Sequence, residues 1–374
     1  MKFRGLSSSE RRLLLVMGAA LLIFALWPAA AVIRESFLNE GTFSLSAWSG
    51  LFVKNWGLIL NSLAVALGVT ALVLPLSILL AAKLLYGSRR GTQLLAGMLV
   101  LSTISPPFVG AMSYLMLFGR RGLITWRLLG FEWNPYGFHG IVMMEALSRL
   151  GVATLLTAAS FRQGDGALEK ASLDLGASPL YTFCSISLPL ALPACFEVFM
   201  LVMVRSLSDF ATPLFVGGRF QVLASKAYNT LTGVGDFPLA CAMNALLLLP
   251  ALVLLFLHFG DGRKSFSMRL KEESSLKLTG APALLLELVS TAFIVLQFMV
   301  YGLIFWGSVM KTWGVDFSFT LEHLKGLMNF QASSYLRSLV CSFSAGLGCA
   351  IFGAVLARLL SQASGKVRGA FQAA

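Results

Sequence analysis

This sequence of 374 residues has little charge, since only 12% of its residues are Asp, Glu, Lys or Arg. A soluble domain usually carries about 25% charged residues, so the composition excludes a soluble globular enzyme. Cysteine is also scarce, and the odd count of five excludes a small secreted domain stapled by disulfides. Apolar residues make up 57% of the chain, which excludes intrinsic disorder. The remaining class is an all-α polytopic membrane protein.

Motifs for cofactor chemistry are missing as well. The one Gly-Lys dipeptide, Gly365-Lys366, is not preceded by the glycine that a phosphate-binding loop requires. The three histidines lie far apart, and no two cysteines have Cys-x-x-Cys spacing. We therefore expect no enzymatic activity, no resident metal and no cofactor bound by this chain.

Long apolar runs dominate what is present, and crossing a bilayer takes about 20 such residues. Eight runs are read from the sequence, at residues 13–33, 56–82, 94–118, 139–160, 189–208, 237–259, 281–309 and 336–360. The first run has a basic start, as a cleaved signal sequence does, but it is longer than the 7–15 apolar residues of a signal core. We interpret all eight as transmembrane helices. Five prolines fall in or beside these runs, where they either kink a helix or line a cavity: Pro75, Pro106, Pro107, Pro193 and Pro250.

The net charge of +12 follows a pattern along the chain. If the N-terminus is cytoplasmic, 17 of the 29 Lys and Arg residues lie in cytoplasmic segments and nine lie in outside segments. Cytoplasmic loops of membrane proteins carry such an excess. The pattern predicts cytoplasmic N- and C-termini and explains the positive charge without any nucleic-acid partner.

A weak internal repeat divides the chain. Thr42-Phe43-Ser44-Leu45-Ser46 recurs as Asp316-Phe317-Ser318-Phe319-Thr320, and Leu60-Asn61-Ser62-Leu63 recurs as Leu336-Arg337-Ser338-Leu339. Repeats of this kind are common in transporters. We predict a six-helix repeat over residues 1–260, a cytoplasmic linker over 261–280, and a partial second repeat with two helices over 281–374.

One predicted cytoplasmic segment, residues 165–193, differs from the other loops. Leu168, Ala171, Ser172 and Leu175 have the spacing of one face of a short amphipathic helix over 167–175. Gly176 suits a turn, and Ser178-Pro179 suits the start of a second helix. The pattern predicts a helix–turn–helix at the membrane surface that can pass a push from a partner into the helix that follows.

This segment resembles the EAA loop of the inner-membrane permease subunits of binding-protein-dependent ABC importers. That pattern has Glu-Ala-Ala, a Gly about seven residues after the Glu, and then Ile-x-Leu-Pro. The chain departs from it at Lys170, where the pattern has Ala. The matching residues are Glu169, Ala171, Gly176, Ala177, Phe183, Ile186, Leu188, Pro189 and Pro193.

Two other stretches are similar to the ferric-iron type of these permeases. They are residues 105–124, which begin Ser105-Pro106-Pro107, and residues 208–218, which begin Ser208-Asp209-Phe210. Phosphonate, thiamine and polyamine permeases share versions of both, so these cargoes are alternatives to ferric iron. Ferric-type members are commonly a fused tandem with two EAA loops. By that standard the present chain lacks most of the second half, and it is expected to be split, truncated or inactive.

The resemblance implies a bacterial inner-membrane subunit that works with a cytosolic ATPase dimer and a periplasmic solute-binding protein. A second permease chain or half is implied as well, and membrane lipid surrounds the assembly. ATP enters through the ATPase partner, which receives the EAA loop. Glu169 is expected to pair with a basic group of that ATPase, and Gly176 to permit the turn. A competing class, an ATP-independent secondary carrier, would leave the loop without a purpose.

Ionisable residues inside the predicted spans are candidates for a gate or pathway. Glu145 and Arg149 lie four residues apart, as do Arg205 and Asp209, and Glu197 lies two turns before Arg205. Each pair either neutralises itself for structural reasons or lines the translocation path. Asp209 is the first candidate for an outer gate, because it lies in the ferric-type Ser-Asp-Phe stretch.

Overall fold

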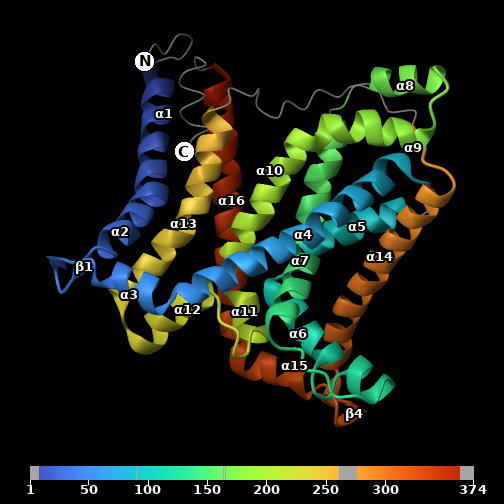
Figure 1. The fold of residues 1–374 in the computed structure, drawn as a ribbon. Coiled ribbons are helices and arrows are strands. Elements are labelled where there is room, and N and C mark those ends of the chain that lie inside the picture. Colours follow the sequence, from blue (N-terminus) through green and yellow to red (C-terminus); the bar gives the residue numbers. More distant parts are fainter. Residues whose placement is uncertain (1–7, 90, 163, 165, 261–275, 363–374) are drawn as a thin grey trace. The chain divides into compact units, whose positions relative to one another are not determined.

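The computed structural model describes residues 8–89, 91–162, 164, 166–260 and 276–362. Within these residues the chain is almost wholly helical, and its strands form two short hairpins (Figure 1). The all-α prediction is therefore confirmed. Residues 261–275 of the predicted linker, and the predicted second repeat beyond residue 362, lie outside the described residues.

Six helices of the described part are long and apolar enough to cross a membrane, and a bent pair raises the count to seven. An eighth helix, α13 (Phe237–Gly260), contributes the shorter apolar stretch Phe237–Val253. Each of the eight predicted runs thus corresponds to a helix or a bent pair.

The run at residues 94–118 differs from the prediction of one span. It forms α5 (Thr92–Ile104) and α6 (Pro107–Phe118), and the described helices here are bent by 108°. Ser105 and Pro106 are extended between them, with ψ values of 134° and 142°. The residue before a proline is disfavoured in the α conformation, so consecutive prolines separate the two helices.

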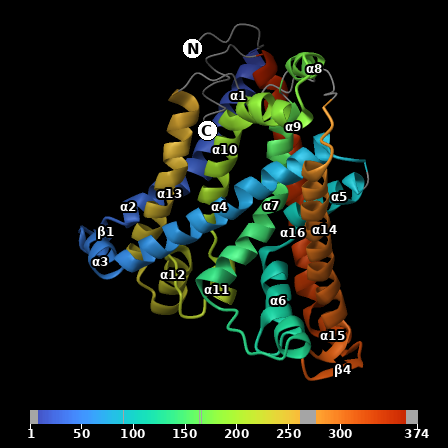
Figure 2. The ribbon, with the colours of Figure 1, turned by 45° about the vertical axis from the view of Figure 1, so that its right-hand side comes forward.

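By packing, the chain forms two units that interleave in sequence. The larger unit comprises residues 50–235 and 264–318. Helices α4, α7 and α10 form its centre, and α5, α6 and α14 pack around them (Figure 2). Its remaining elements are short and mostly connect these helices. Its elements are α4 (Trp56–Tyr86), α5, α6, η2 (Leu123–Leu128), α7 (Phe138–Arg162), α8 (Gly166–Asp174), α9 (Pro179–Thr182), η3 (Phe183–Ser187), α10 (Leu188–Leu207), α11 (Ala211–Val216), α12 (Leu223–Asn229), η4 (Thr230–Val234), α14 (Ala281–Ser308) and β3 (Met310–Thr312).

The smaller unit comprises residues 1–49, 236–263 and 319–374. Within it α2 packs on α13, and α1 packs on α16 through Leu14, Met17 and Leu359. A hairpin pairs Leu38 with Phe43. Its elements are α1 (Ser8–Leu21), η1 (Leu22–Leu26), α2 (Trp27–Glu35), β1 (Leu38–Asn39), β2 (Thr42–Phe43), α13, α15 (Glu322–Gly326), η5 (Leu327–Gln331) and α16 (Ala332–Gln362). Two elements, α3 (Ser46–Lys54) and β4 (Asp316–Phe319), fall across the boundary between the units.

The two copies of the internal sequence repeat have the same order of local structure. Both copies of the recurring segment contribute the second strand of a hairpin, β2 in one case and β4 in the other. A 31-residue helix follows each hairpin, and α16 begins 276 residues after α4. A 28-residue helical segment precedes each hairpin, Ser8–Glu35 in the first copy and α14 in the second. The domain limits proposed from the sequence stay a prediction.

We predict that Gly151→Ala destabilises the larger unit. A Cβ atom at Gly151 on α7 would lie 2.2 Å from Ser102 Oγ and 2.6 Å from the Leu99 carbonyl oxygen of α5. Overpacking of this kind costs about 1–3 kcal/mol. The thermal unfolding midpoint of the purified chain should therefore fall.

The matched control is Gly97→Ala on α5, where a Cβ atom meets nothing within 4 Å. Alanine favours a helix over glycine by about 1 kcal/mol, so this control should be neutral or stabilising. Equal midpoints for the two variants would contradict the close packing of α5 on α7.

Candidate functional site: the α8–α9 loop and the α7–α10 polar cluster

The predicted helix–turn–helix is present in the larger unit. Helix α8 ends at a turn in which Gly176 has a φ of +87°, a conformation that glycine adopts without strain. The Ala177 amide donates to the Ser172 carbonyl at 3.1 Å, which closes the turn. Ser178 caps α9 by accepting a hydrogen bond from the Tyr181 amide at 3.3 Å. The sequence prediction of a glycine turn followed by a serine cap is confirmed.

Glu169 is the residue that fastens α8 to the rest of the unit. Its side chain is 4% exposed. Its Oε1 accepts hydrogen bonds from the Tyr86 hydroxyl at 3.0 Å and the Ser187 hydroxyl at 2.5 Å. Tyr86 ends α4 and Ser187 precedes α10, so one carboxylate joins the loop to two long helices. The carboxylate is buried within the loop's own attachment, and its pairing with a basic group of a partner stays a prediction.

Aromatic rings pack around Tyr86, one of the residues that hold this carboxylate. Tyr86 packs edge-on against Phe161 and Phe183, with ring centroids 6.0 Å and 5.7 Å away. Thr182 of α9 also lies 2.9 Å from Ser172 of α8, measured between the hydroxyl oxygens. The loop is consequently packed on a small core and does not behave as a loosely tethered segment.

Several apolar residues of the loop face outward, although Leu173 packs on the core cluster. Leu168 is 49% exposed, Leu175 is 89% exposed, and Ala171 between them is exposed as well. Leu168, Ala171 and Leu175 of the predicted stripe thus lie on the exposed side of the loop, and Glu169 points inward. Leu180 and Tyr181 of α9 add further exposed apolar surface. We call these five residues (Leu168, Ala171, Leu175, Leu180 and Tyr181) the outer loop surface. Exposed apolar side chains are the kind of surface through which proteins bind partners.

The other matching residues of the loop lie at its base. Ala177 and Ile186 are half-buried, and Pro189 is exposed in the first turn of α10. Two aliphatic residues outside the motif, Leu276 and Leu278, pack in the same core cluster as Tyr86, and the Leu278 amide donates to the Tyr86 carbonyl at 2.9 Å.

An ion pair next to the loop was not found by sequence reasoning. Lys83 of α4 is 1% exposed and pairs with Glu287 of α14. The Ser88 hydroxyl also donates to the Glu287 carboxylate, at 2.5 Å. The residues are 204 positions apart, so no local spacing could have revealed the pair. It joins α14 to the end of α4 that also contacts the loop.

The candidate gate residues form a second cluster, with partners other than those expected. Arg149 Nη2 donates to Asp209 Oδ2 at 2.8 Å and to the Arg205 carbonyl at 3.2 Å. Glu145 is fully buried, and its Oε2 accepts from the Ser206 hydroxyl at 2.5 Å. In place of the expected pairs within one helix, Arg149 of α7 pairs with Asp209 just beyond the end of α10, and Glu145 of α7 bonds to Ser206 of α10.

Asp209 also shapes the chain that follows it. Its Oδ1 accepts from the Ala211 and Thr212 amides at 2.9 Å and 3.2 Å, and its Oδ2 accepts from the Thr212 hydroxyl at 2.9 Å. These contacts fix the entry to α11. In contrast, the side chains of Arg205 and Glu197 are exposed, and Glu197 lines a hollow between α7 and α10. The structure therefore brings together Glu145, Arg149 and Asp209, and leaves Arg205 and Glu197 outside the cluster.

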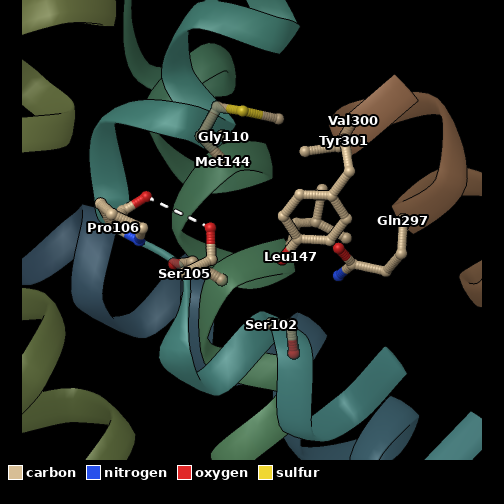
Figure 3. A pocket seen from close by; sticks show the side chains of 10 residues that line it. Ser102, Ser105, Pro106, Gly110, Met144, Leu147, Gln297, Val300 and Tyr301 are labelled. Carbon is tan, nitrogen blue, oxygen red and sulfur yellow. Dashed lines mark hydrogen bonds between the residues drawn. The ribbon is translucent and has the colours of Figure 1, made fainter. Parts of the chain in front are cut away.

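A small pocket lies at the break between α5 and α6. Ser102, Ser105 and Pro106 form one wall, and Gln297 and Tyr301 of α14 face them (Figure 3). Gln297 is 2% exposed. Across the same junction, the Ser113 hydroxyl of α6 donates to the Val300 carbonyl of α14 at 2.7 Å. Among the described residues, no group of three or more His, Cys, Asp or Glu side chains could hold a metal ion, in this pocket or elsewhere.

These features define a membrane-embedded helical bundle with a structured surface loop, the architecture of a transport permease. Residues 73–260 match the family model described as "Binding-protein-dependent transport system inner membrane component". The chain therefore belongs to this family of multi-pass membrane permeases.

Individual relatives support the ferric type. The chain is 28% identical over 276 residues to the ferric transport system permease protein FbpB of Actinobacillus pleuropneumoniae, covering 70% of this chain and 40% of that protein. It is 27% identical over 365 residues to the putative ferric transport system permease protein FbpB 1 of Haemophilus influenzae, covering 90% of this chain and 56% of that protein. The chain thus spans about half the length of these two relatives.

Shorter permeases match less of the chain. The molybdenum transport system permease protein ModB of Haemophilus influenzae is 32% identical over 46% of this chain and 79% of its own length. A solved bacterial ABC transporter involved in the import of alginate has the same fold, with a TM-score of 0.58 at 16% identity, over 68% of this chain and 95% of that one.

We predict that Tyr86→Phe loosens α8 without disturbing the aromatic packing. The substitution removes one hydrogen bond to the buried Glu169 carboxylate, and hydrogen bonds to charged groups contribute about 1.5–3 kcal/mol. Amide hydrogen exchange in residues 166–174 should become about 10- to 100-fold faster. Tyr181→Phe is the control, because that ring is 63% exposed, and it should leave exchange unchanged. Unaltered exchange in both variants would show that Glu169 does not fasten the loop.

We predict that Asp209→Asn lowers solute uptake by the assembled importer at least tenfold at unchanged protein abundance. Asparagine keeps an oxygen for the Ala211 and Thr212 amides but loses the charge that pairs with Arg149. The control is Asp236→Asn, an exposed residue whose Oδ1 accepts from the Leu239 amide at 3.0 Å. Normal uptake by the Asp209 variant would refute a gate role.

Proposed function

We propose that this chain is the membrane subunit of an ATP-driven ABC importer, with the α8–α9 loop as its coupling element. The observation that supports this proposal is that Glu169 holds the loop from its buried side, while the outer loop surface stays exposed. A loop built in this way can receive a partner on one side and transmit its motion on the other. Family membership supports an import role, since the matching model describes a binding-protein-dependent system.

The partners follow from that role. A cytosolic ATPase dimer binds the outer loop surface and supplies ATP hydrolysis, so the chain itself needs no cofactor. A periplasmic solute-binding protein delivers the cargo, and a second permease chain or half completes the path. The family description supports a bacterial inner-membrane location, and the excess of Lys and Arg in alternate loops supports cytoplasmic termini.

Ferric iron is the proposed cargo. The support is coverage: two ferric permeases match 70% and 90% of this chain, whereas ModB matches 46%. A polyamine is the second candidate, because the spermidine/putrescine permease PotC of Escherichia coli K12 is matched over 85% of its length at 28% identity. Uptake assays with each binding protein in turn would separate these two cargoes.

We predict that Leu175→Glu reduces recovery of the ATPase subunit with the purified chain at least tenfold. Leu175 is 89% exposed on the outer loop surface, and a carboxylate there would have to be desolvated on binding. Leu128→Glu is the matched control, because Leu128 is 76% exposed on η2, away from the loop in sequence. It should leave recovery unchanged.

Two further variants test the loop from the inside. Gly176→Pro forces a φ near −65° where the turn has +87°, and Glu169→Arg puts a cation among the groups that hold the carboxylate. Both should abolish ATPase binding while the chain stays in the membrane. Uptake that persists in the absence of any ATPase would instead establish a secondary carrier.

A further inference from the structure

Arg149 of α7 holds the far end of α10 in the larger unit. Its Nη2 donates to the Arg205 carbonyl at 3.2 Å and to Asp209 Oδ2 at 2.8 Å. The Arg205 carbonyl can accept this bond because the Asp209 amide donates to the Ser206 carbonyl instead, at 3.1 Å. A cation is favoured at the C-terminal end of a helix, where backbone carbonyls lack partners within the helix. The guanidinium therefore ties α10 to α7 at this end.

Two buried polar atoms beside this contact lack a hydrogen-bond partner among the described residues. They are Arg149 Nε and Glu145 Oε1. The other oxygen of the fully buried Glu145 side chain accepts from the Ser206 hydroxyl. Leaving a buried N–H or a buried carboxyl oxygen unpaired costs free energy. The contact with α10 thus leaves one donor and one acceptor of α7 unsatisfied.

These two atoms belong to neighbouring side chains of α7. Glu145 and Arg149 are four residues apart in the helix, so their Cβ atoms lie about 5–6 Å apart on one side of it. A Glu that precedes its basic partner by four residues has the favourable orientation for a pair within a helix. This is the pair that the sequence predicts and that the described structure replaces by contacts to other residues. Rotation of the two side chains can join them without any change in α7.

The charges of the cluster give Arg149 two possible partners. Glu145 is attracted by Arg149 and repelled by Asp209, so two acidic groups compete for one guanidinium. Asp209 can release Arg149, because it keeps its contacts with the Ala211 amide and with the amide and hydroxyl of Thr212. Glu145 has no such reserve, since the Ser206 hydroxyl is its one side-chain hydrogen bond among the described residues.

We propose that Arg149 exchanges Asp209 for Glu145 as its partner during transport. In the second state the end of α10 has separated from α7. That movement breaks the contacts of Arg149 with Asp209 and Arg205, and it removes Ser206 from Glu145. The pair within α7 then keeps the guanidinium and the carboxylate together, as charges inside a membrane require. Glu145 is a positioning residue in this scheme. The inference rests on the proposed function, because the α8–α9 loop is what displaces α10.

Substitutions on the two helices should bias the exchange in opposite directions. Ser206→Ala removes a contact that exists only in the described state, so it favours the second state. Glu145→Gln keeps an oxygen for the Ser206 hydroxyl but removes the charge that attracts Arg149, so it favours the described state. A merely structural role for Glu145 predicts no opposition, because either change would then loosen the same contact between α7 and α10.

Distances between two spin labels in the assembled importer measure the two states. Spin-labelled amino acids replace Met143, which is exposed on α7, and Ser208, which is exposed directly after α10. Without nucleotide, Ser206→Ala should raise the longer-distance population relative to the shorter one at least tenfold. Adding Glu145→Gln to that variant should reverse the shift. The proposal is overturned if Ser206→Ala leaves the ratio unchanged, or if the double variant keeps the longer distance.

Ser148→Ala is the matched control, because its hydroxyl donates to the Glu145 carbonyl within α7 and contacts no residue of α10. It should leave the ratio of the two populations unchanged. With ATP, the unsubstituted chain should move toward the longer distance, and Glu145→Gln should hold the shorter one and lower uptake at least tenfold at equal abundance. Failure of the ATPase to bind the chain would refute the proposed function. The reversal measured without nucleotide tests the exchange by itself.

Discussion

The buried carboxylate of Glu169 is the constraint on which the loop depends. A charged group that is 4% exposed is stable only when its oxygens accept hydrogen bonds, and Tyr86 and Ser187 donate two of them. Because these donors belong to the end of α4 and the entrance of α10, the loop is positioned by two long helices at once. Burial of Glu169 also sets the rotation of α8, which turns Leu168 and Leu175 outward. An exposed apolar surface is therefore a consequence of satisfying one charge.

The two copies of the repeat show that one helix contact is stabilised by different chemistry. Lys83 is 1% exposed and requires the Glu287 carboxylate as a partner, because an unpaired buried ammonium is strongly unfavourable. Leu359 and Leu14 occupy the corresponding positions and gain stability from apolar burial. The common feature is that the two helices of each copy are in contact. Sequence comparison residue by residue misses it, since a charge pair in one copy stands where the other has two leucines.

Several features could be read from the sequence because they depend on local rules. Long apolar runs predicted the helices, Gly176 predicted the turn, and Ser178 predicted the cap of α9. Contacts between distant segments could not be read in this way. The i, i+4 spacing of Glu145 and Arg149 suggested a pair within α7, but Arg149 binds Asp209 of the α10 end and Glu145 binds Ser206. The pattern of α8 also did not reveal which side of the helix is buried, because that side is set by the hydrogen bond between Glu169 and Tyr86, 83 positions earlier.

Helix α10 connects the two clusters of the larger unit directly. It follows the loop at Ser187 and runs to Leu207, and its 20 residues extend for about 30 Å. Ser206 and the Arg205 carbonyl at its far end contact Glu145 and Arg149 of α7, and Asp209 follows immediately. Pro193 lacks the amide hydrogen that would bond to the carbonyl of Pro189, so the first turns of α10 have one backbone hydrogen bond fewer. A displacement of the loop would therefore be absorbed as bending at these prolines or carried along α10. Glu169 holds both Ser187 and Tyr86, so bending at the prolines alone would separate Ser187 from α4. Movement of α10 as a whole against α7 would instead shift the contacts of Arg149 and Glu145.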